Sequence, residues 1–122
     1  RSEADGTAVE FNYEIQSNAI EEKTSLMMKD ILRQVVEEGG GKKAYLEGFS
    51  IGGKTATSQK LPRGSGKYIS SFIGFSPVDN AKVIAMCLID EPQGIYYGGT
   101  IAAPVIRELF ENILPYLEIQ NN

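Results

Sequence analysis

The feature that most constrains the fold is a series of three segments with the character of β-strands. They cover about Phe49–Ser58, Tyr68–Phe75 and Lys82–Ile89, and the second is rich in aromatic and β-branched residues, which favour strands. The connection Ser76–Asn80 carries turn-forming residues. A connection this short joins neighbouring antiparallel strands, because parallel strands need a long crossover. We therefore expect a three-stranded antiparallel sheet.

A helix is expected before the sheet. Asn18 and Glu21 have the spacing of a capping box, and the glycine run 39–41 ends the helix because glycine disfavours helical backbone. Core packing is the expected role of the two methionines in its apolar stripe, since apolar residues three and four apart share one helical face. This stripe consists of Met27, Met28, Ile31, Leu32, Val35 and Val36.

A second helix is expected after the sheet. Thr100 can cap it, with Pro104 in its opening turns, and Pro115 ends or kinks it. Two helices and three antiparallel strands make an α+β layer arrangement. The expected buried stripe of this helix consists of Val105, Ile106, Leu109, Phe110, Ile113 and Leu114.

The N-terminal region contains one further candidate element. Ala8–Ile15 alternates apolar and polar residues, which predicts a strand or an extended segment. Residues 1–7 are mostly polar and are expected to be disordered. A chain of 122 residues is one domain or a piece of one.

Composition excludes several functions. With 12 basic and 16 acidic residues, and no basic stripe, a nucleic-acid partner is not expected. The absence of histidine excludes Ser-His-Asp and Cys-His catalysis and most zinc sites. The single cysteine, Cys87, forms no internal disulfide and lies in the apolar run Val83–Ile89, where a small buried apolar role is expected. That run is too short to span a bilayer, and Arg1–Thr7 shows no signal peptide, so any export or anchoring segment lies outside this chain.

One motif suggests a nucleotide site. Gly48–Thr55 fits the phosphate-loop pattern G-x-x-x-x-G-K-[ST]. The apolar run Val83–Ile89, followed by Asp90 and Glu91, imitates the strand with a terminal acidic pair that holds magnesium in ATPases. A phosphate loop needs a strand before it and a helix after it. The preceding stretch Gly39–Glu47 is glycine-rich and charged, and the following stretch Ala56–Gly66 soon meets proline and glycine. The parallel βαβ order is also missing, so an ATPase is the disfavoured alternative.

The same residues suit a carboxylate-binding strand better. On a strand, Thr55 and Thr57 lie on one face and Lys54 and Ala56 on the other. Two hydroxyls at this spacing can bind one carboxylate, and a nearby ammonium adds charge. A backbone N–H of the same strand can point at a developing oxyanion. Penicillin-binding and β-lactamase enzymes place a K-T-G triplet on such a strand.

The flanking sequence strengthens this interpretation. Four blocks resemble, in order and spacing, the C-terminal portion of class B penicillin-binding proteins, most of all the division and sporulation transpeptidases of Gram-positive bacteria. The resemblance runs from about Val9 to Ile119. The blocks are Gly52–Gln59, Tyr68–Pro77, Val83–Pro92 and Tyr96–Pro104.

The resemblance implies a partial transpeptidase domain over residues 1–122, related to serine β-lactamases. The family activity is acyl transfer at D-alanyl-D-alanine termini of peptidoglycan stem peptides, with β-lactams as acylating inhibitors. The implied location of the parent protein is the extracytoplasmic face of the cell membrane, anchored by a segment outside this chain. Neither a cofactor nor a metal is expected.

The resemblance also implies roles for single residues. Lys54 corresponds to the lysine that supports proton transfer and binds the substrate carboxylate. Thr55 and Thr57 correspond to the carboxylate-binding hydroxyls, and the N–H of Thr57 to one oxyanion donor. The structural alternative is that the threonines fill a strand and that Lys54 is a solvated edge charge.

Two departures from the family qualify the activity. S-x-x-K, which holds the nucleophile, and S-x-N do not occur in these 122 residues, and Ser58 beside the motif has no identifiable activating partner. We therefore expect no turnover by this chain alone. A non-catalytic binding module of the same sub-fold is the second hypothesis. Ala56 stands where the family usually has glycine, and its methyl group could crowd the cleft on the side of Lys54.

Partners follow from the same resemblance. The missing N-terminal half of the transpeptidase domain is the expected partner of this chain. Without it, apolar surface is exposed, and self-association is expected.

Overall fold

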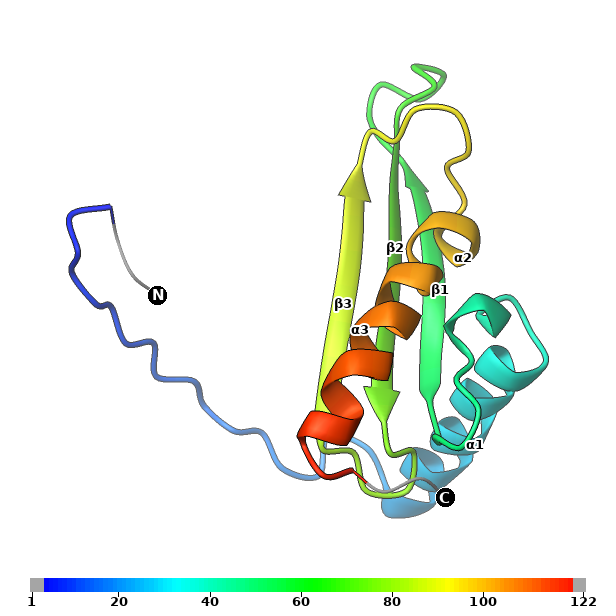
Figure 1. Cartoon of the computed structure of the whole chain (residues 1–122). Helices are drawn as coiled ribbons and strands as arrows, with labels where there is room; N and C mark the ends of the chain where they lie inside the picture. The colour runs from blue at the N-terminus through cyan, green and yellow to red at the C-terminus, as the bar shows by residue number, and fades with distance from the viewer. Residues whose placement is uncertain (1–3, 120–122) are drawn as a thin grey trace.

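The three predicted strands form one antiparallel sheet in the order β1–β2–β3 (Figure 1). A computed structural model describes residues 4–119. Strand β1 covers Gly52–Gln59, β2 covers Tyr68–Ser76 and β3 covers Val83–Asp90. The prediction of a three-stranded antiparallel sheet between two helices is confirmed, with strand ends displaced by up to three residues.

The pairing register divides the sheet into two faces. Cross-strand partners share a face, so the pairs Thr55↔Phe72 and Thr57↔Ser70 lie on one face, and the pair Lys54↔Ile73 lies on the other. Phe72 and Ser70 are fully buried, whereas Ile73 is exposed. One face of the sheet is therefore covered and the other is open.

Helix α3 (Ala103–Tyr116) covers the first face. Its residues Ile106, Phe110 and Leu114 are buried with Phe72 of β2 in one core cluster. Ile113 of the predicted stripe also packs against this core. The prediction is wrong for Val105 and Leu109, which are exposed.

The predicted ends of α3 are partly right. Pro104 lies in its first turn as predicted, and Pro115 lies one residue before its end at Tyr116. Capping by Thr100 is wrong, because Thr100 lies inside the short helix α2 (Gly98–Ile101) and α3 has no side-chain cap.

Helix α1 (Glu22–Glu37) runs beside β1 and ends before the glycine run as predicted (Figure 1). Core packing of the methionines is wrong: Met27 is 58% exposed and Met28 is 45% exposed, while Val36 in the last turn is buried. The helix thus packs through its C-terminal turns. A short 3-10 helix, η1 (Lys42–Ala44), leads from there toward β1.

The capping box is also wrong. Glu21 is the N-cap of α1 and forms no side-chain cap hydrogen bond. Asn18 has a φ of 58°, a left-handed turn conformation that places it outside the helix.

The remaining N-terminal prediction is partly answered. Ala8–Ile15 runs extended away from the sheet and joins none of its strands (Figure 1). Disorder was expected for residues 1–7, of which residues 1–3 lie outside the described part of the chain. For residues 4–7 it stays a prediction. Cys87 is a free, half-buried cysteine packed against the core, in keeping with its expected role.

The open face of the sheet is apolar. Its β3 side chains alternate with those that face α3, and they are more than half exposed. Lys54 and Ala56 of β1 lie on this same face by register. The exposed apolar residues of this open face are Ile73, Ile84, Met86 and Leu88.

Candidate functional site

The glycines before Lys54 are explained by packing and not by phosphate binding. A Cβ on Gly53 would lie 2.5 Å from Cζ of Phe72, and one on Gly52 would lie 2.5 Å from Cζ of Phe75. The G-K-T stretch then continues as strand to Gln59, with no helix after it. The rejection of the phosphate-loop interpretation is therefore confirmed.

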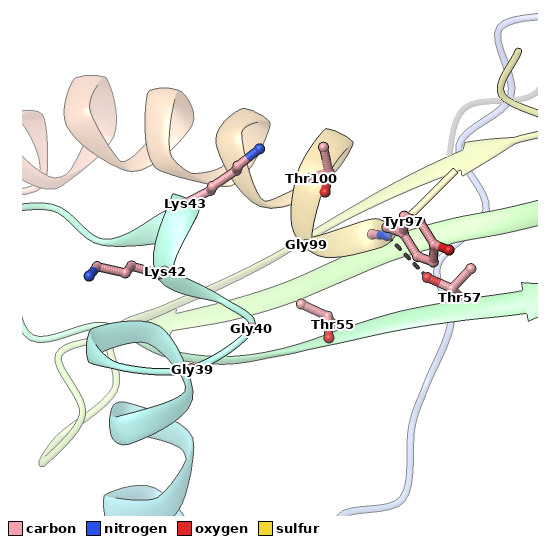
Figure 2. Close-up of a pocket in the computed structure, with 10 residues that line it drawn as sticks. Gly39, Gly40, Lys42, Lys43, Thr55, Thr57, Tyr97, Gly99 and Thr100 are labelled. Carbon is pink, nitrogen blue, oxygen red and sulfur yellow. Dashed lines mark hydrogen bonds between the residues drawn. The ribbon is translucent and has the colours of Figure 1, made fainter. Parts of the chain in front are cut away.

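Thr55 and Thr57 line the same hollow, as their shared face predicts. Figure 2 shows both threonines on β1 facing α2, with Tyr97 beside Thr57. The hollow has a volume of about 390 Å³, and none of its lining residues is acidic. It is therefore chemically suited to an anion. The full lining is Gly39, Gly40, Lys42, Lys43, Thr55, Thr57, Tyr97, Gly98, Gly99 and Thr100.

Glycines let the backbone approach closely around this hollow. A Cβ on Gly99 would lie 2.4 Å from the carbonyl oxygen of Gly40, and one on Gly98 would lie 2.4 Å from that of Ala56. The N–H of Gly98 donates a hydrogen bond of 3.1 Å to Oγ1 of Thr57. The loop that ends at Gly98, the first residue of α2, is thus connected directly to the threonine.

The cations lie at two places around the threonines. Lys54 is exposed on the open face and does not line the hollow. Its Nζ lies 2.9 Å from the carbonyl oxygen of Thr55 and 3.4 Å from Oγ1 of the same residue. Lys42 and Lys43 do line the hollow, and sequence reasoning missed them because two exposed lysines after a glycine run have no distinctive pattern.

The backbone of β1 presents donors to the free edge. The N–H of Lys60 donates 2.8 Å to the carbonyl of Lys67, which continues the β1–β2 register by one pair. N–H directions alternate along a strand. The N–H groups of Thr55 and Thr57 therefore point away from β2, toward the edge where an oxyanion donor is needed.

Aromatic side chains gather near one end of the hollow, which Tyr97 lines. Tyr96 stacks on Tyr68 with ring centroids 3.9 Å apart and an interplanar angle of 5°, and it contacts Tyr97 at 4.7 Å. A hydrogen bond with Tyr96 raises the pKa of Tyr97, so the Tyr97 hydroxyl stays uncharged at neutral pH. The hydroxyl of Ser70 donates a hydrogen bond to the carbonyl oxygen of Tyr96.

An ion cluster of Lys60, Asp90 and Glu91 lies at the same end of the sheet. Nζ of Lys60 lies 2.8 Å from Glu91 and 3.0 Å from Asp90. These contacts raise the pKa of Lys60, and the hydrogen bond from Lys60 lowers the pKa of Glu91. The cluster links the end of β1 to the segment that follows β3.

Residues 4–119 lack two kinds of feature. No group of three or more metal-ligating side chains forms there. No helix in that range has both the length and the apolar character needed to cross a membrane.

Comparisons with known proteins agree with the geometry. A family model described as "Penicillin binding protein transpeptidase domain" matches residues 7–111. Stage V sporulation protein D of Bacillus subtilis (strain 168) is 38% identical over 86% of this chain, which covers 17% of that protein. The probable peptidoglycan D,D-transpeptidase PenA of Neisseria flavescens is 35% identical over 94% of this chain, which covers 32% of that protein. The chain therefore spans less than a third of the length of these relatives.

A solved structure agrees as well. The apo transpeptidase domain of penicillin-binding protein 3 from Burkholderia pseudomallei superposes with a TM-score of 0.71 at 30% sequence identity. The match covers 82% of this chain and 32% of that one. The resemblance inferred from the four sequence blocks is thus confirmed. With the family model matching most of its length, the chain belongs to the transpeptidase domain family of penicillin-binding proteins.

Proposed function

We propose that this chain forms the carboxylate-binding wall of a peptidoglycan D,D-transpeptidase active site. The observation that carries the proposal is the pair of hydroxyls on β1. Thr55 and Thr57 lie side by side in a hollow without acidic groups, at the free edge of the sheet. Hydroxyl donors backed by cations are what a peptide's terminal carboxylate requires.

Each site residue has a role in this proposal. Thr55 and Thr57 donate hydrogen bonds to the carboxylate of a D-alanyl-D-alanine terminus. Lys54 supplies positive charge and supports proton transfer on the open face of the sheet. The N–H of Thr57 stabilises the oxyanion that forms when the scissile carbonyl is attacked, because a preoriented donor gains strength as that charge develops.

The nucleophile comes from outside these 122 residues in this proposal. S-x-x-K and S-x-N are absent from the sequence, so the chain alone performs no turnover. It is one partial domain, the C-terminal subdomain of a transpeptidase domain whose remaining part supplies the serine and its lysine. In that whole protein, stem peptides are the substrates that acylate the serine, and β-lactams are inhibitors that acylate it as well. The reaction takes place on the extracytoplasmic face of the membrane.

A second candidate is a non-catalytic binding module of the same sub-fold, and one observation favours it. Ala56 is exposed on the same face as Lys54, where its methyl group narrows the approach of a substrate to the lysine. The two candidates differ in their coding DNA. A reading frame encoding S-x-x-K upstream in the same polypeptide supports the transpeptidase.

Binding of a terminal carboxylate tests the proposal directly. ¹⁵N-labelled chain is titrated with N-acetyl-D-alanyl-D-alanine, and the expected shifts centre on the amides of Thr55 and Thr57. The carboxamide form of the same dipeptide is the ligand control and should shift them far less. Replacing both threonines by valine keeps their shape and should abolish the response, while Ser58→Ala on the same strand should not. Equal shifts with acid and amide would contradict carboxylate binding.

Covalent labelling tests the absence of turnover. The chain incubated with a fluorescent penicillin should remain unlabelled after denaturing electrophoresis, because no activated serine is present. A labelled band from this chain alone would overturn that part of the proposal.

A further inference from the structure

We infer that Ser70 is a positioning residue that acts on Thr57 through Tyr96 and Gly98. It fixes the Thr57 hydroxyl as a hydrogen donor toward the hollow. This inference rests on the proposed function, because the anion that receives the donated hydrogen is the ligand carboxylate.

The hydrogen bond at Thr57 has a fixed direction. A hydroxyl has one hydrogen to donate and two lone pairs that accept. The backbone N–H of Gly98 can only donate, so Oγ1 of Thr57 accepts at 3.1 Å. The hydroxyl hydrogen remains for another partner, and the hollow is the space that Thr57 lines. A group held this way selects an acceptor, such as a carboxylate.

Contacts with two strands fix the position of Gly98. A Cβ at this residue would lie 2.3 Å from the carbonyl oxygen of Ser71 and 2.4 Å from that of Ala56. The loop therefore lies directly on the paired backbones of β1 and β2. Any shift of Gly98 moves its N–H relative to Thr57.

Ser70 attaches the loop that ends at Gly98 to β2. Ser70 is the cross-strand partner of Thr57 and is fully buried on the same face. Its hydroxyl donates to the carbonyl of Tyr96, two residues before Gly98. Tyr96 is also held by its stack on Tyr68. The loop is thus attached to β2 through Ser70, the residue that pairs with Thr57 across the two strands.

The chain provides a closely matched control for Ser70. Ser76 lies on the same strand and face, is also fully buried, and donates to the carbonyl of Ser50 at 2.8 Å. Ser70→Ala and Ser76→Ala therefore remove equivalent buried hydrogen bonds. Only the first of these bonds connects to the loop over Thr57.

The test measures the Gly98 amide in the free chain. Ser70→Ala and Thr57→Val should each speed hydrogen exchange of this amide by roughly fivefold relative to amides of α3, the factor expected for one lost hydrogen bond. Ser76→Ala should leave that ratio unchanged, and Thr57→Ser should restore it. If the alanine variant fails to fold, Ser70→Cys is used instead, because it replaces the hydroxyl with a thiol that donates only weakly.

Peptide affinity supplies the second readout. Ser70→Ala should weaken binding of N-acetyl-D-alanyl-D-alanine by roughly threefold to tenfold, while Ser76→Ala should not. If Ser70→Ala and Ser76→Ala changed the hydrogen exchange of the Gly98 amide equally, the inference would be overturned. If the unmodified chain binds no dipeptide, the proposed function fails, and the Gly98 exchange ratio still decides whether Ser70 positions the loop.

Discussion

The side chains of Lys54 and Thr55 leave β1 on opposite faces, yet the Lys54 ammonium lies 2.9 Å from the Thr55 carbonyl and 3.4 Å from its hydroxyl. The long lysine stem therefore folds around the free edge of the sheet. This brings its charge beside a hydroxyl that lines the hollow on the other face. One cation can thus serve both faces of the edge strand.

Removing the Lys54 charge should weaken carboxylate binding and leave the fold intact. Two unit charges 4 Å apart in water attract by about 1 kcal/mol, so Lys54→Met should reduce dipeptide affinity by roughly fivefold at low salt. The melting temperature should not change, because the side chain is exposed. NMR titration at two salt concentrations measures both affinity and screening. Lys23→Met on α1 is the control, and a similar loss there would argue for general charge attraction only.

Gly98→Ala should destabilise the fold strongly. Its Cβ would lie 2.3 Å and 2.4 Å from two backbone carbonyl oxygens, those of Ser71 and Ala56, which belong to paired strands and cannot give way separately. Overpacking of this kind costs about 1–3 kcal/mol. Urea unfolding followed by circular dichroism measures it. Gly40→Ala is the control, since a Cβ there meets nothing within 4 Å. Equal urea midpoints for the two variants would contradict the prediction and show that the backbone around Gly98 shifts to accommodate the methyl group.

The ion cluster at Lys60 should make stability depend on pH. The hydrogen bond from Lys60 lowers the pKa of Glu91, so Glu91 stabilises the fold above its unfolded pKa and this contribution is lost as the pH falls through the folded value. The raised pKa of Lys60 acts in the alkaline range, where stability is lost as the pH rises through that value. Between these limits the cluster contributes fully.

Glu91→Gln isolates the acidic limb of this dependence. The variant should unfold at lower urea than the unmodified chain at neutral pH. The two midpoints should converge as the pH falls through the lowered pKa of Glu91 in the folded chain, where its carboxylate is protonated and the ion pair is lost. Glu108→Gln, an exposed position on α3, controls for net charge. A constant gap between the midpoints at all pH values would contradict a titrating ion cluster.

Local sequence pattern predicted the sheet well and its surroundings less well. The strands were found within three residues because branched and aromatic residues at Tyr68–Ser76 reflect a local preference. An apolar helical stripe indicates which face is apolar but not whether anything covers it. The prediction that Met27 and Met28 pack in the core is therefore wrong.

The site was predicted in part for similar reasons. Strand alternation alone placed Thr55 and Thr57 on one face, and the structure brings them into one hollow. The contribution of Gly98 could not be predicted, because its position depends on backbone contacts with strands far away in sequence. The prediction of Thr100 as a helix cap is wrong for the same reason. Thr100 lies inside α2, and the contacts that position α2 cannot be read from the local sequence.

Self-association should occur through the open face of the sheet. Ile84, Met86 and Leu88 are 67%, 58% and 56% exposed on adjacent alternate positions of β3. Contiguous apolar surface of this kind favours association, and β3 is also an edge strand. Sedimentation velocity over a hundredfold range of concentration should show the sedimentation coefficient rising with concentration.

A charge placed on that face should reverse the effect. Met86→Lys buries an ammonium in any contact made through the open face, and desolvating an unpaired charge costs several kcal/mol, so the variant should stay monomeric. Gln59→Lys adds the same charge at an exposed position on the opposite face of β1 and should associate like the unmodified chain. Loss of association in both variants would assign the effect to net charge, and retention in both would place the contact elsewhere, such as the exposed stripe of α1.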